Sequence, residues 1–438
     1  MAKPFHLSSL LLTLLICLGG AAYSDPGNGP DKYLPGKYLI GDDAVLELHQ
    51  ALEAYVTADQ VANIGFSVWQ DSVRVAEGYY GPVSAARLET VSDTSLYRIR
   101  SMTKPVTAIG LLILMERGHF KLSDPLTDFL PEFERTETLG DYDPDGTLFT
   151  YRAPYPPTME QLLSHTAGLG YWRDARGPVD QMLFDAGISA STTIDDLVEQ
   201  AARVPYKKMP GAEWHYSMAS DLQGAIIERI TGQRLGDFLQ EELFSPLGMQ
   251  DTHFYVPEHK AERLSGITRR DGSGLISVPG EDFRKVAEDK TYHEGGHGLY
   301  STQSDYFRFL EFLQNEGRSA VGPLLSPESL ALFRTNAIKF RRQPARQSGR
   351  GGGAGLGFGF GVATVEDPIA AKLRAPKGTY FWYGALGTWF WIDPVNEIIF
   401  IGMIQSETPI APSLMKTSML AVYGPGDDPD NALPPPPS

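Results

Sequence analysis

The β-like segments of this 438-residue chain are concentrated toward its two ends. Near the N-terminus lie the runs IGFSVWQ and VRVAEGYYG, and Asp71-Ser72 between them predicts a β-hairpin. Near the C-terminus follow LGFGFGVATV, TYFWYGALGTWFWIDP and EIIFIGMIQ, the last two separated by the turn-like Pro394-Val395-Asn396. Strands at both ends with helices between them predict one sheet that is built from both ends and flanked by helices.

The middle of the chain carries mostly helical patterns. Apolar residues at helical spacing begin at Asp43, before the first strand, and a strongly apolar helix is expected to end at Gly118. Four further segments show helical periodicity with Gly or Pro stops: MEQLLSHTAGL, TIDDLVEQAARV, SDLQGAIIERITG and RLGDFLQEELFSPLGM. We therefore expect a domain over residues 42–425 with an inserted, mostly helical subdomain at about residues 120–290.

The composition is that of an ordinary globular protein, with 42% hydrophobic and 11% aromatic residues. Acidic residues outnumber basic ones by 54 to 38, so the formal net charge is −16. An acidic chain has no general affinity for nucleic acid or anionic membranes. We expect a small-molecule substrate as the partner, with no nucleic acid.

The first 24 residues have the pattern of a secretory signal peptide. Lys3 precedes the apolar run LLLTLLICLGG, and Ala22-Tyr23-Ser24 places small residues at the cleavage-determining positions. The mature chain is then expected to begin near Asp25 and to be secreted or periplasmic. The apolar run is too short for a comfortable membrane span, so no stable membrane insertion is expected.

The only cysteine, Cys17, lies inside this signal. A lipoprotein signal would place a small residue before the cysteine, but Ile16 stands there, which disfavours a lipid anchor. A mature chain without cysteine has no disulfides, no cysteine nucleophile and no thiolate metal site. Residues 25–41 are expected to be a flexible lead-in and residues 426–438 a disordered tail, because both are rich in Pro and Asp.

The stretch His293-Glu294-Gly295-Gly296-His297 matches the HExxH pattern of zinc metalloproteases. That pattern works on a helix, where two histidines four residues apart share a face and ligate one metal. Two adjacent glycines cost about 1 kcal/mol each relative to alanine in a helix interior, and Gly298 adds a third. The segment is therefore a poor helix, and no metal or other cofactor is predicted.

An S-x-x-K element, Ser101-Met102-Thr103-Lys104, stands at the predicted start of a helix. A spacing of three puts the hydroxyl and the amine on one helical face, where a neutral Lys104 could take the proton of Ser101. The element alone is not specific, because Ser413-Leu414-Met415-Lys416 matches it near the C-terminus. For an isolated match, a serine N-cap with a solvated lysine is the simpler interpretation.

The order of the other motifs adds specificity. Downstream of Ser101 come Tyr216, just before a predicted helix, then GGHGLYST and FWYGALGTWFWIDP, accompanied by LLSHTAGL, FSPLGMQDTHF and STQSDYFRFL. From about Gly65 to Gln405, this sequence resembles the serine β-lactamase and penicillin-binding-protein superfamily, in particular its class C-like, family VIII carboxylesterase branch. The resemblance implies an α/β (α+β) fold with a central antiparallel sheet flanked by helices.

The resemblance also implies roles for individual residues. Ser101 would be the acylated nucleophile, Lys104 its proton acceptor and Tyr216 a general base or proton relay; which of the last two is the true base stays open. The strand motif, K-T-G in β-lactamases, falls on Trp382-Tyr383-Gly384. The backbone N–H groups of Ser101 and Ala385 would stabilise the oxyanion, and GGHGLYST would form a glycine-rich loop near the active site.

Two departures from the β-lactamase pattern concern substrate recognition. Met218 replaces the asparagine of the Y-x-N motif, and Trp382 replaces the K-T-G lysine. Both changes remove partners of a charged amide substrate, so an ester with an apolar acyl or alcohol group is predicted. Candidates for lining an apolar pocket are Tyr171, Trp172, Trp214 and Trp389.

Three alternatives to the esterase remain. The first is an amide hydrolase of the same fold, acting on a β-lactam, a D-amino-acid peptide or another small amide. The second is a non-catalytic binding protein on a hydrolase scaffold, which the presence of Ser101, Lys104 and Tyr216 disfavours. The third is the zinc protease, with His293 and His297 as metal ligands.

Overall fold

A computed structural model describes residues 37–143, 147–173, 177–188, 191–278, 292–338 and 353–424. The predicted signal peptide, most of the lead-in and the predicted tail lie outside these residues. Within the described ranges, no helix combines the length and apolarity that crossing a membrane requires.

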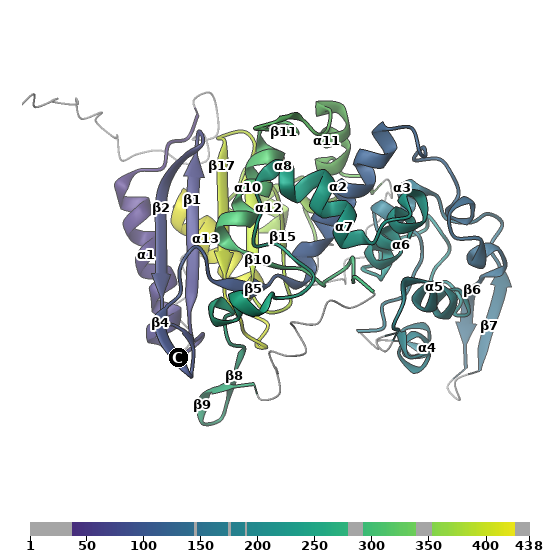
Figure 1. Cartoon of the computed structure of the whole chain (residues 1–438), viewed down its shortest axis with the longest axis horizontal. Coiled ribbons are helices and arrows are strands. Elements are labelled where there is room, and N and C mark those ends of the chain that lie inside the picture. The colour runs from purple at the N-terminus through teal and green to yellow at the C-terminus, as the bar shows by residue number, and fades with distance from the viewer. Residues whose placement is uncertain are drawn as a thin grey trace, which may run out of the picture.

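A seven-stranded antiparallel sheet forms the centre of the fold (Figure 1). Its strands are β1 (Ile64–Gln70), β2 (Val73–Tyr80), β13 (Leu356–Phe358), β14 (Ala363–Val365), β15 (Tyr380–Tyr383), β16 (Trp389–Asp393) and β17 (Ile398–Met403). They lie in the order β13-β14-β15-β16-β17-β1-β2, and β1 pairs with β17 from Gly65↔Met403 to Gln70↔Ile398. The prediction of one sheet built from both ends of the chain is confirmed.

The two predicted turns of this sheet are present. Asp71 and Ser72 connect β1 to β2 and have φ angles of 54° and 61°, the left-handed region that a two-residue type I′ hairpin requires. Between β16 and β17, Oδ1 of Asp393 accepts hydrogen bonds from the backbone N–H groups of Val395 at 2.9 Å and Asn396 at 3.2 Å. Local turn chemistry therefore sets the register of both strand pairs.

Helices cover both faces of the sheet. On one side, α1 (Asp42–Thr57) packs against α13 (Ala411–Tyr423), and on the other α10 (Gln303–Gln314) packs on β17 and β1 (Figure 1). All residues of β16 and β17 are buried, as expected for strands covered on both faces.

The segment between β2 and β13 contains the helices that the sequence predicted, which are α2 (Thr103–Glu116), α3 (Met159–Leu163), α5 (Ile194–Ala202), α6 (Ala219–Thr231), α7 (Leu235–Leu239), α8 (Ser245–Leu247) and α10. Helices that the sequence did not indicate are α4 (Pro178–Asp185), α11 (Pro327–Arg334) and, further on, α12 (Pro368–Ala371). The strand-like run directly before α2 forms β5 (Leu96–Arg98), as the sequence indicates. Short strands that the sequence did not indicate are β3 (Pro82–Ser84), β4 (Arg87–Thr90), β6 (Glu137–Tyr142), β7 (Leu148–Arg152), β8 (Thr268–Asp271), β9 (Gly274–Ser277), β10 (Tyr300–Thr302), β11 (Arg318–Ser319) and β12 (Gly322–Pro323). The domain limits of 42–425 and the subdomain limits stay predictions.

The helix α2 is buried along nearly its whole length, from Thr103 to Leu114. It packs against α6. A helix this apolar on all sides forms only where neighbours surround it, and here those neighbours bring the start of α6 to the start of α2. This packing positions the S-x-x-K element opposite Tyr216.

Candidate active site

Ser101 lies in the tight turn that joins β5 to α2. The turn is a 3₁₀ segment over Arg100–Met102, and Arg100 has a φ of +49°, a left-handed conformation that residues other than glycine rarely adopt. Such strain persists only where the surroundings enforce it, and it is common at catalytic residues. The chain therefore bends sharply just before Ser101, at the N-terminus of a buried helix.

The amine of Lys104 lies beside this serine. Its Nζ is 3.4 Å from Oγ of Ser101 and donates a hydrogen bond of 2.7 Å to the carbonyl oxygen of Gly296. The side chain is only 1% exposed, and Nζ lies 4.7 Å from the ring centroid of Tyr216 and 5.6 Å from that of Tyr171. The amine is thus held between a backbone carbonyl and two aromatic rings, with little access to water.

Tyr216 completes the arrangement from the residues before α6. Its hydroxyl donates a hydrogen bond of 2.8 Å to Oγ of Ser101. The ring is buried, with Tyr171 edge-on at 5.3 Å and His165 stacked on it at 5.3 Å with an interplanar angle of 16°. The structure thus brings Ser101, Lys104 and Tyr216 together, as the sequence predicted.

His165 supports Tyr216 from behind, a role that the sequence did not reveal. Its Nδ1 accepts a hydrogen bond of 3.2 Å from the backbone N–H of Ser217, and its backbone has a φ of +56°. Complete burial, with a contribution from the charge of Lys104, lowers the pKa of His165 well below its usual value. His165 is therefore a neutral imidazole, fixed in place and stacked on the ring of Tyr216.

The HEGGH segment forms a turn in the described structure rather than a helix. The carbonyl oxygen of Gly296 accepts from Lys104, and its N–H donates a hydrogen bond of 2.9 Å to Oδ1 of Asp221 in α6. The carbonyl oxygen of Gly295 accepts from Oγ1 of Thr107 in α2 at 2.8 Å. This loop therefore bridges α2 and α6 and holds the lysine amine in place.

Space requires glycine at position 295 and is tight at Gly296. A Cβ on Gly295 would lie 2.4 Å from the carbonyl oxygen of Ser220, and one on Gly296 would lie 3.0 Å from Oδ2 of Asp221. The predicted glycine-rich loop beside the active site is thus where the resemblance placed it. Asp221, buried at 1% exposure, is a further site residue that no sequence motif indicated.

The two histidines of HEGGH do not come together to form a metal site. His293 stacks on Phe254 at 4.5 Å, and its Nδ1 accepts from the N–H of Gly236 at 3.0 Å. His297 instead contacts Trp172 and Arg173. Across the described part of the chain, no three His, Cys, Asp or Glu side chains are grouped so that they could hold a metal ion. The geometry disagrees with the zinc-protease interpretation.

The strand motif lies beside the turn that carries Ser101. Trp382, in β15, is buried with its ring centroid 5.6 Å from that of Tyr216. A Cβ on Gly384 would lie 2.4 Å from the carbonyl oxygen of Ile99, so only glycine allows β15 to approach the turn that carries Ser101. Ala385 follows on the exposed side.

The backbone N–H groups of Ser101 and Ala385 have no acceptor among the residues that the structure describes. Two free N–H donors on adjacent segments are what an oxyanion hole requires. The placement of Gly384 and Ala385 is thus compatible with the role that the resemblance implies for them.

The aromatic candidates separate into two groups. Tyr171 and Trp214 surround Tyr216, with Trp214 at 6.4 Å between ring centroids, and Trp172 packs on Tyr171. Trp389 was a wrong candidate for the pocket, because it lies on β16 and its Nε1–H donates to Oγ of Ser418 in α13 at 3.3 Å. It belongs to the core between the sheet and α13.

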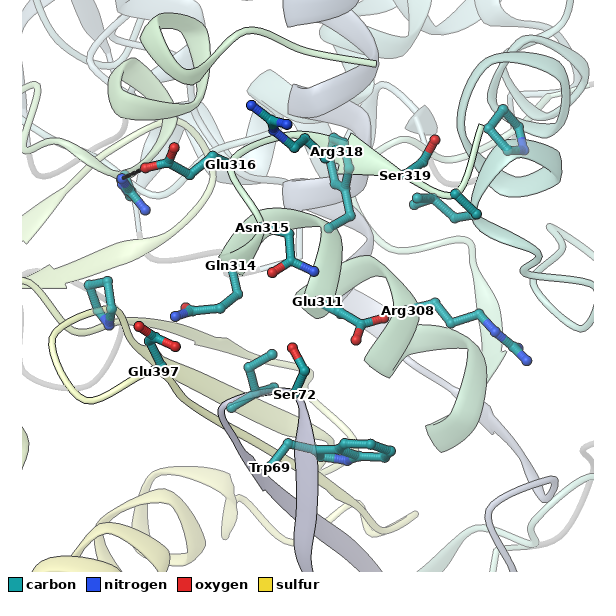
Figure 2. A pocket seen from close by; sticks show the side chains of 17 residues that line it. Trp69, Ser72, Arg308, Glu311, Gln314, Asn315, Glu316, Arg318, Ser319 and Glu397 are labelled. Carbon is teal, nitrogen blue, oxygen red and sulfur yellow. Dashed lines mark ion pairs between the residues drawn. The ribbon is translucent and has the colours of Figure 1, made fainter. Parts of the chain in front are cut away.

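A groove of about 970 Å³ lies elsewhere, between α10, the β11–β12 hairpin and the β16–β17 turn (Figure 2). Charged and polar side chains line it, including Arg308, Glu311 and Arg318, and they point in different directions. The lining residues do not include Ser101, Lys104 or Tyr216. The groove is separate from the catalytic arrangement.

Comparisons with known proteins identify the family and the fold. The family model described as Beta-lactamase matches residues 48–419. Esterase EstB of Burkholderia gladioli is 33% identical over 319 residues, which cover 68% of this chain and 74% of that protein. Lovastatin esterase of Penicillium rubens is 29% identical over 356 residues, covering 74% and 82%. The structure of simvastatin synthase (LovD) from Aspergillus terreus superposes with a TM-score of 0.75 at 23% identity, covering 87% of this chain and 98% of that one. The last comparison establishes likeness of fold.

Proposed function

The chain belongs to the beta-lactamase family, as its ordered motifs predicted, and from this premise we propose that it cleaves carboxylic ester bonds of small substrates through an acyl-enzyme on Ser101. Membership of this family makes the protein a serine hydrolase. The observation that carries the ester proposal is the hydrogen bond from Tyr216 to Ser101, with Lys104 beside it and aromatic side chains around all three.

In the proposed reaction, Oγ of Ser101 attacks the ester carbonyl, and its proton passes to the Lys104–Tyr216 pair. The backbone N–H groups of Ser101 and Ala385 bind the oxyanion; loss of one such donor typically costs about 3 kcal/mol of barrier. The C–O bond to the alcohol then breaks, and Tyr216 returns a proton to the leaving oxygen. A water molecule, deprotonated by the same pair, attacks the acyl-enzyme and releases the acid.

The walls of the site favour an ester over a charged amide. Met218 is fully buried at the start of α6 and offers no amide group, and Trp382 offers an indole ring where β-lactamases have an ammonium group. The buried Nε1–H of Trp382 has no acceptor within the described residues, so it is a candidate donor to a neutral substrate oxygen. Apolar acyl or alcohol groups gain most from such walls.

The proposal is tested by the hydrolysis of p-nitrophenyl butyrate, with the Ser101→Ala variant as control. We expect turnover by the wild-type protein, none by the variant, and a butyryl adduct on the Ser101 peptide in mass spectrometry. Equal turnover by both proteins would exclude Ser101 as the nucleophile. Nitrocefin turnover comparable to ester turnover would favour the amide-hydrolase alternative.

We also propose that the protein acts outside the cytoplasm, on the basis of the signal pattern in residues 1–24. The measurement is N-terminal sequencing of the protein after expression from the full-length gene and cell fractionation. A mature N-terminus near Asp25 in the exported fraction is the expected result, whereas a retained Met1 in the cytosol would contradict it.

A further inference from the structure

Two arginines lie beside the catalytic residues, although the chain as a whole is acidic. Arg100 immediately precedes Ser101. Arg173 contacts the imidazole of His297, the residue that follows Gly296, whose carbonyl oxygen binds Lys104. Arg173 therefore lies beside the loop that holds the lysine amine, and Arg100 is the residue before Ser101.

The charges of these arginines act on one another. Burial lowers the pKa of Arg100, and the positive charge of Arg173 lowers it further. Arg98, on the preceding strand, is buried as well; burial and the charge of Arg100 are among the causes that bring its pKa to about 10. Guanidinium groups of like charge that are removed from water repel each other, and an anion between them would relieve that repulsion.

The carboxylate of Glu294 lies within this cluster. Its Oε1 lies 4.0 Å from Nη2 of Arg173, and its Oε2 lies 3.2 Å from Nε2 of His297. Glu294 also acts on Arg100, since its charge partly offsets the lowering of that pKa. Glu294 thus acts on both arginines, and the charge of Asp221 acts on His297 as well.

The guanidinium of Arg173 is both accessible and oriented. Its side chain is 39% exposed, and its Cζ lies 4.0 Å from the ring centroid of Trp172, as in a stacked cation–π pair. An arginine held flat on an aromatic ring presents its N–H donors in a fixed plane, which suits the planar carboxylate group. A ligand can reach this arginine from the solvent.

We propose that the esters hydrolysed at Ser101 carry a carboxylate, which Arg173 binds, while the charge of Arg100 adds to the attraction. This inference rests on the proposed esterase function and adds the class of substrate. Trp382 stands where β-lactamases have the lysine of the K-T-G motif, so that positive charge is missing from β15. Arg100, in the turn before α2, and Arg173, two residues after Tyr171, supply positive charge from other segments. The substrate then has an apolar part against the aromatic walls and an anionic part at the arginines.

The experiment compares matched esters that differ only in charge. One pair is p-nitrophenyl hydrogen adipate and p-nitrophenyl 6-methylheptanoate, in which an isopropyl group replaces the carboxylate on the acyl side. The other is 4-carboxyphenyl butyrate and 4-isopropylphenyl butyrate, which places the charge on the alcohol side. The quantity measured is the ratio of kcat/KM for the anionic and the neutral member, with the Ser101→Ala protein as blank for spontaneous hydrolysis.

We expect the wild-type protein to prefer the anionic member of at least one pair and the preference to weaken at high salt. Arg173→Met should lower that ratio about 10-fold to 100-fold, the usual range for removal of a hydrogen bond to a charged group. Arg173→Lys should keep part of the preference for the anionic ester, because lysine retains the positive charge. Arg308→Met is the matched control, because Arg308 is 44% exposed and also paired with a carboxylate, but lies in the separate groove; it should leave the ratio unchanged.

A ratio at or below one in both pairs, or an equal loss for both members in Arg173→Met, would overturn the inference while leaving the esterase intact. Failure of the proposed function is different, because the wild-type protein would then hydrolyse none of the esters faster than Ser101→Ala. A binding measurement keeps the inference testable even in that case. Adipate should raise the Tm of Ser101→Ala but not of Ser101→Ala/Arg173→Met, and equal shifts in both would count against it.

Discussion

The hydroxyl of Tyr216 lies 2.8 Å from Oγ of Ser101, although 115 residues separate them in the chain. The amine of Lys104, three residues from Ser101, is further from the same oxygen at 3.4 Å and makes its short hydrogen bond to Gly296. This geometry favours Tyr216 as the direct proton partner of the nucleophile. Lys104, 4.7 Å from the tyrosine ring centroid, is placed to stabilise negative charge on that ring.

Tyr216→Phe should therefore lower kcat for p-nitrophenyl butyrate by about 10²-fold to 10⁴-fold, the range for loss of a positioned acid–base group. KM should change little, because the ring and its packing remain. Tyr151→Phe, at an exposed position of β7, is the control and should leave both constants unchanged. A Tyr216→Phe variant with kcat within a few-fold of wild type would move the role of base to Lys104.

Lys104→Met should abolish most turnover and leave the fold intact. Methionine has a similar length, and the change removes a buried amine without opening a large cavity. We expect kcat to fall at least about 10²-fold, with a Tm close to that of the wild type. The second S-x-x-K element provides the control: Lys416→Met, in α13, should keep full activity. Loss of activity in that variant would contradict the assignment.

Gly384→Ala tests the close approach of β15 to the nucleophile turn. The new Cβ would lie 2.4 Å from both the carbonyl oxygen of Ile99 and Oγ1 of Thr388, so the backbone must shift. We expect a loss of about 1–3 kcal/mol in the free energy of unfolding, typical of overpacking, together with a fall in kcat. Gly272→Ala is the matched control, because its Cβ would meet no atom within 4 Å. Wild-type stability in Gly384→Ala would show that the turn can relax.

His253 should make stability depend on pH. Burial, followed by the charge of Lys260, lowers its pKa to about 4 in the folded protein from 6.5. Between these values the unfolded chain binds more protons than the folded one, so stability is complete above pH 6.5 and is lost as the pH falls toward 4. Buried His165 and His297 shift in the same direction.

The measurement is urea denaturation at pH 7.5 and at pH 5.0. His253→Gln should reduce the difference between the two free energies of unfolding, because glutamine can still accept the hydrogen bond from Nζ of Lys260 but does not titrate. His119→Gln, at an exposed position, should leave the difference as it is. An unchanged difference in His253→Gln would show that other groups cause the acid sensitivity.

The sequence by itself determined the architecture. Strand-forming runs at both ends predicted the sheet in which β1 pairs with β17, and Asp71-Ser72 predicted the hairpin at its edge. These features depend on local periodicity and turn chemistry, which can be read along the chain. The ordered motifs also indicated Ser101, Lys104 and Tyr216, which the structure brings together.

Only the tertiary structure decided which of the two S-x-x-K elements lies beside Tyr216, and whether HEGGH forms a helix or a loop. Ser101-x-x-Lys104 meets Tyr216 because α2 packs against α6, whereas the second element lies on α13 in another part of the fold. HEGGH became a loop because its glycines pass between α2 and α6, where no Cβ fits. The stacking of His165 on Tyr216 and the contact of Arg173 with His297 follow from the tertiary packing as well, since contacts between distant segments depend on how buried surfaces fit and not on spacing along the chain.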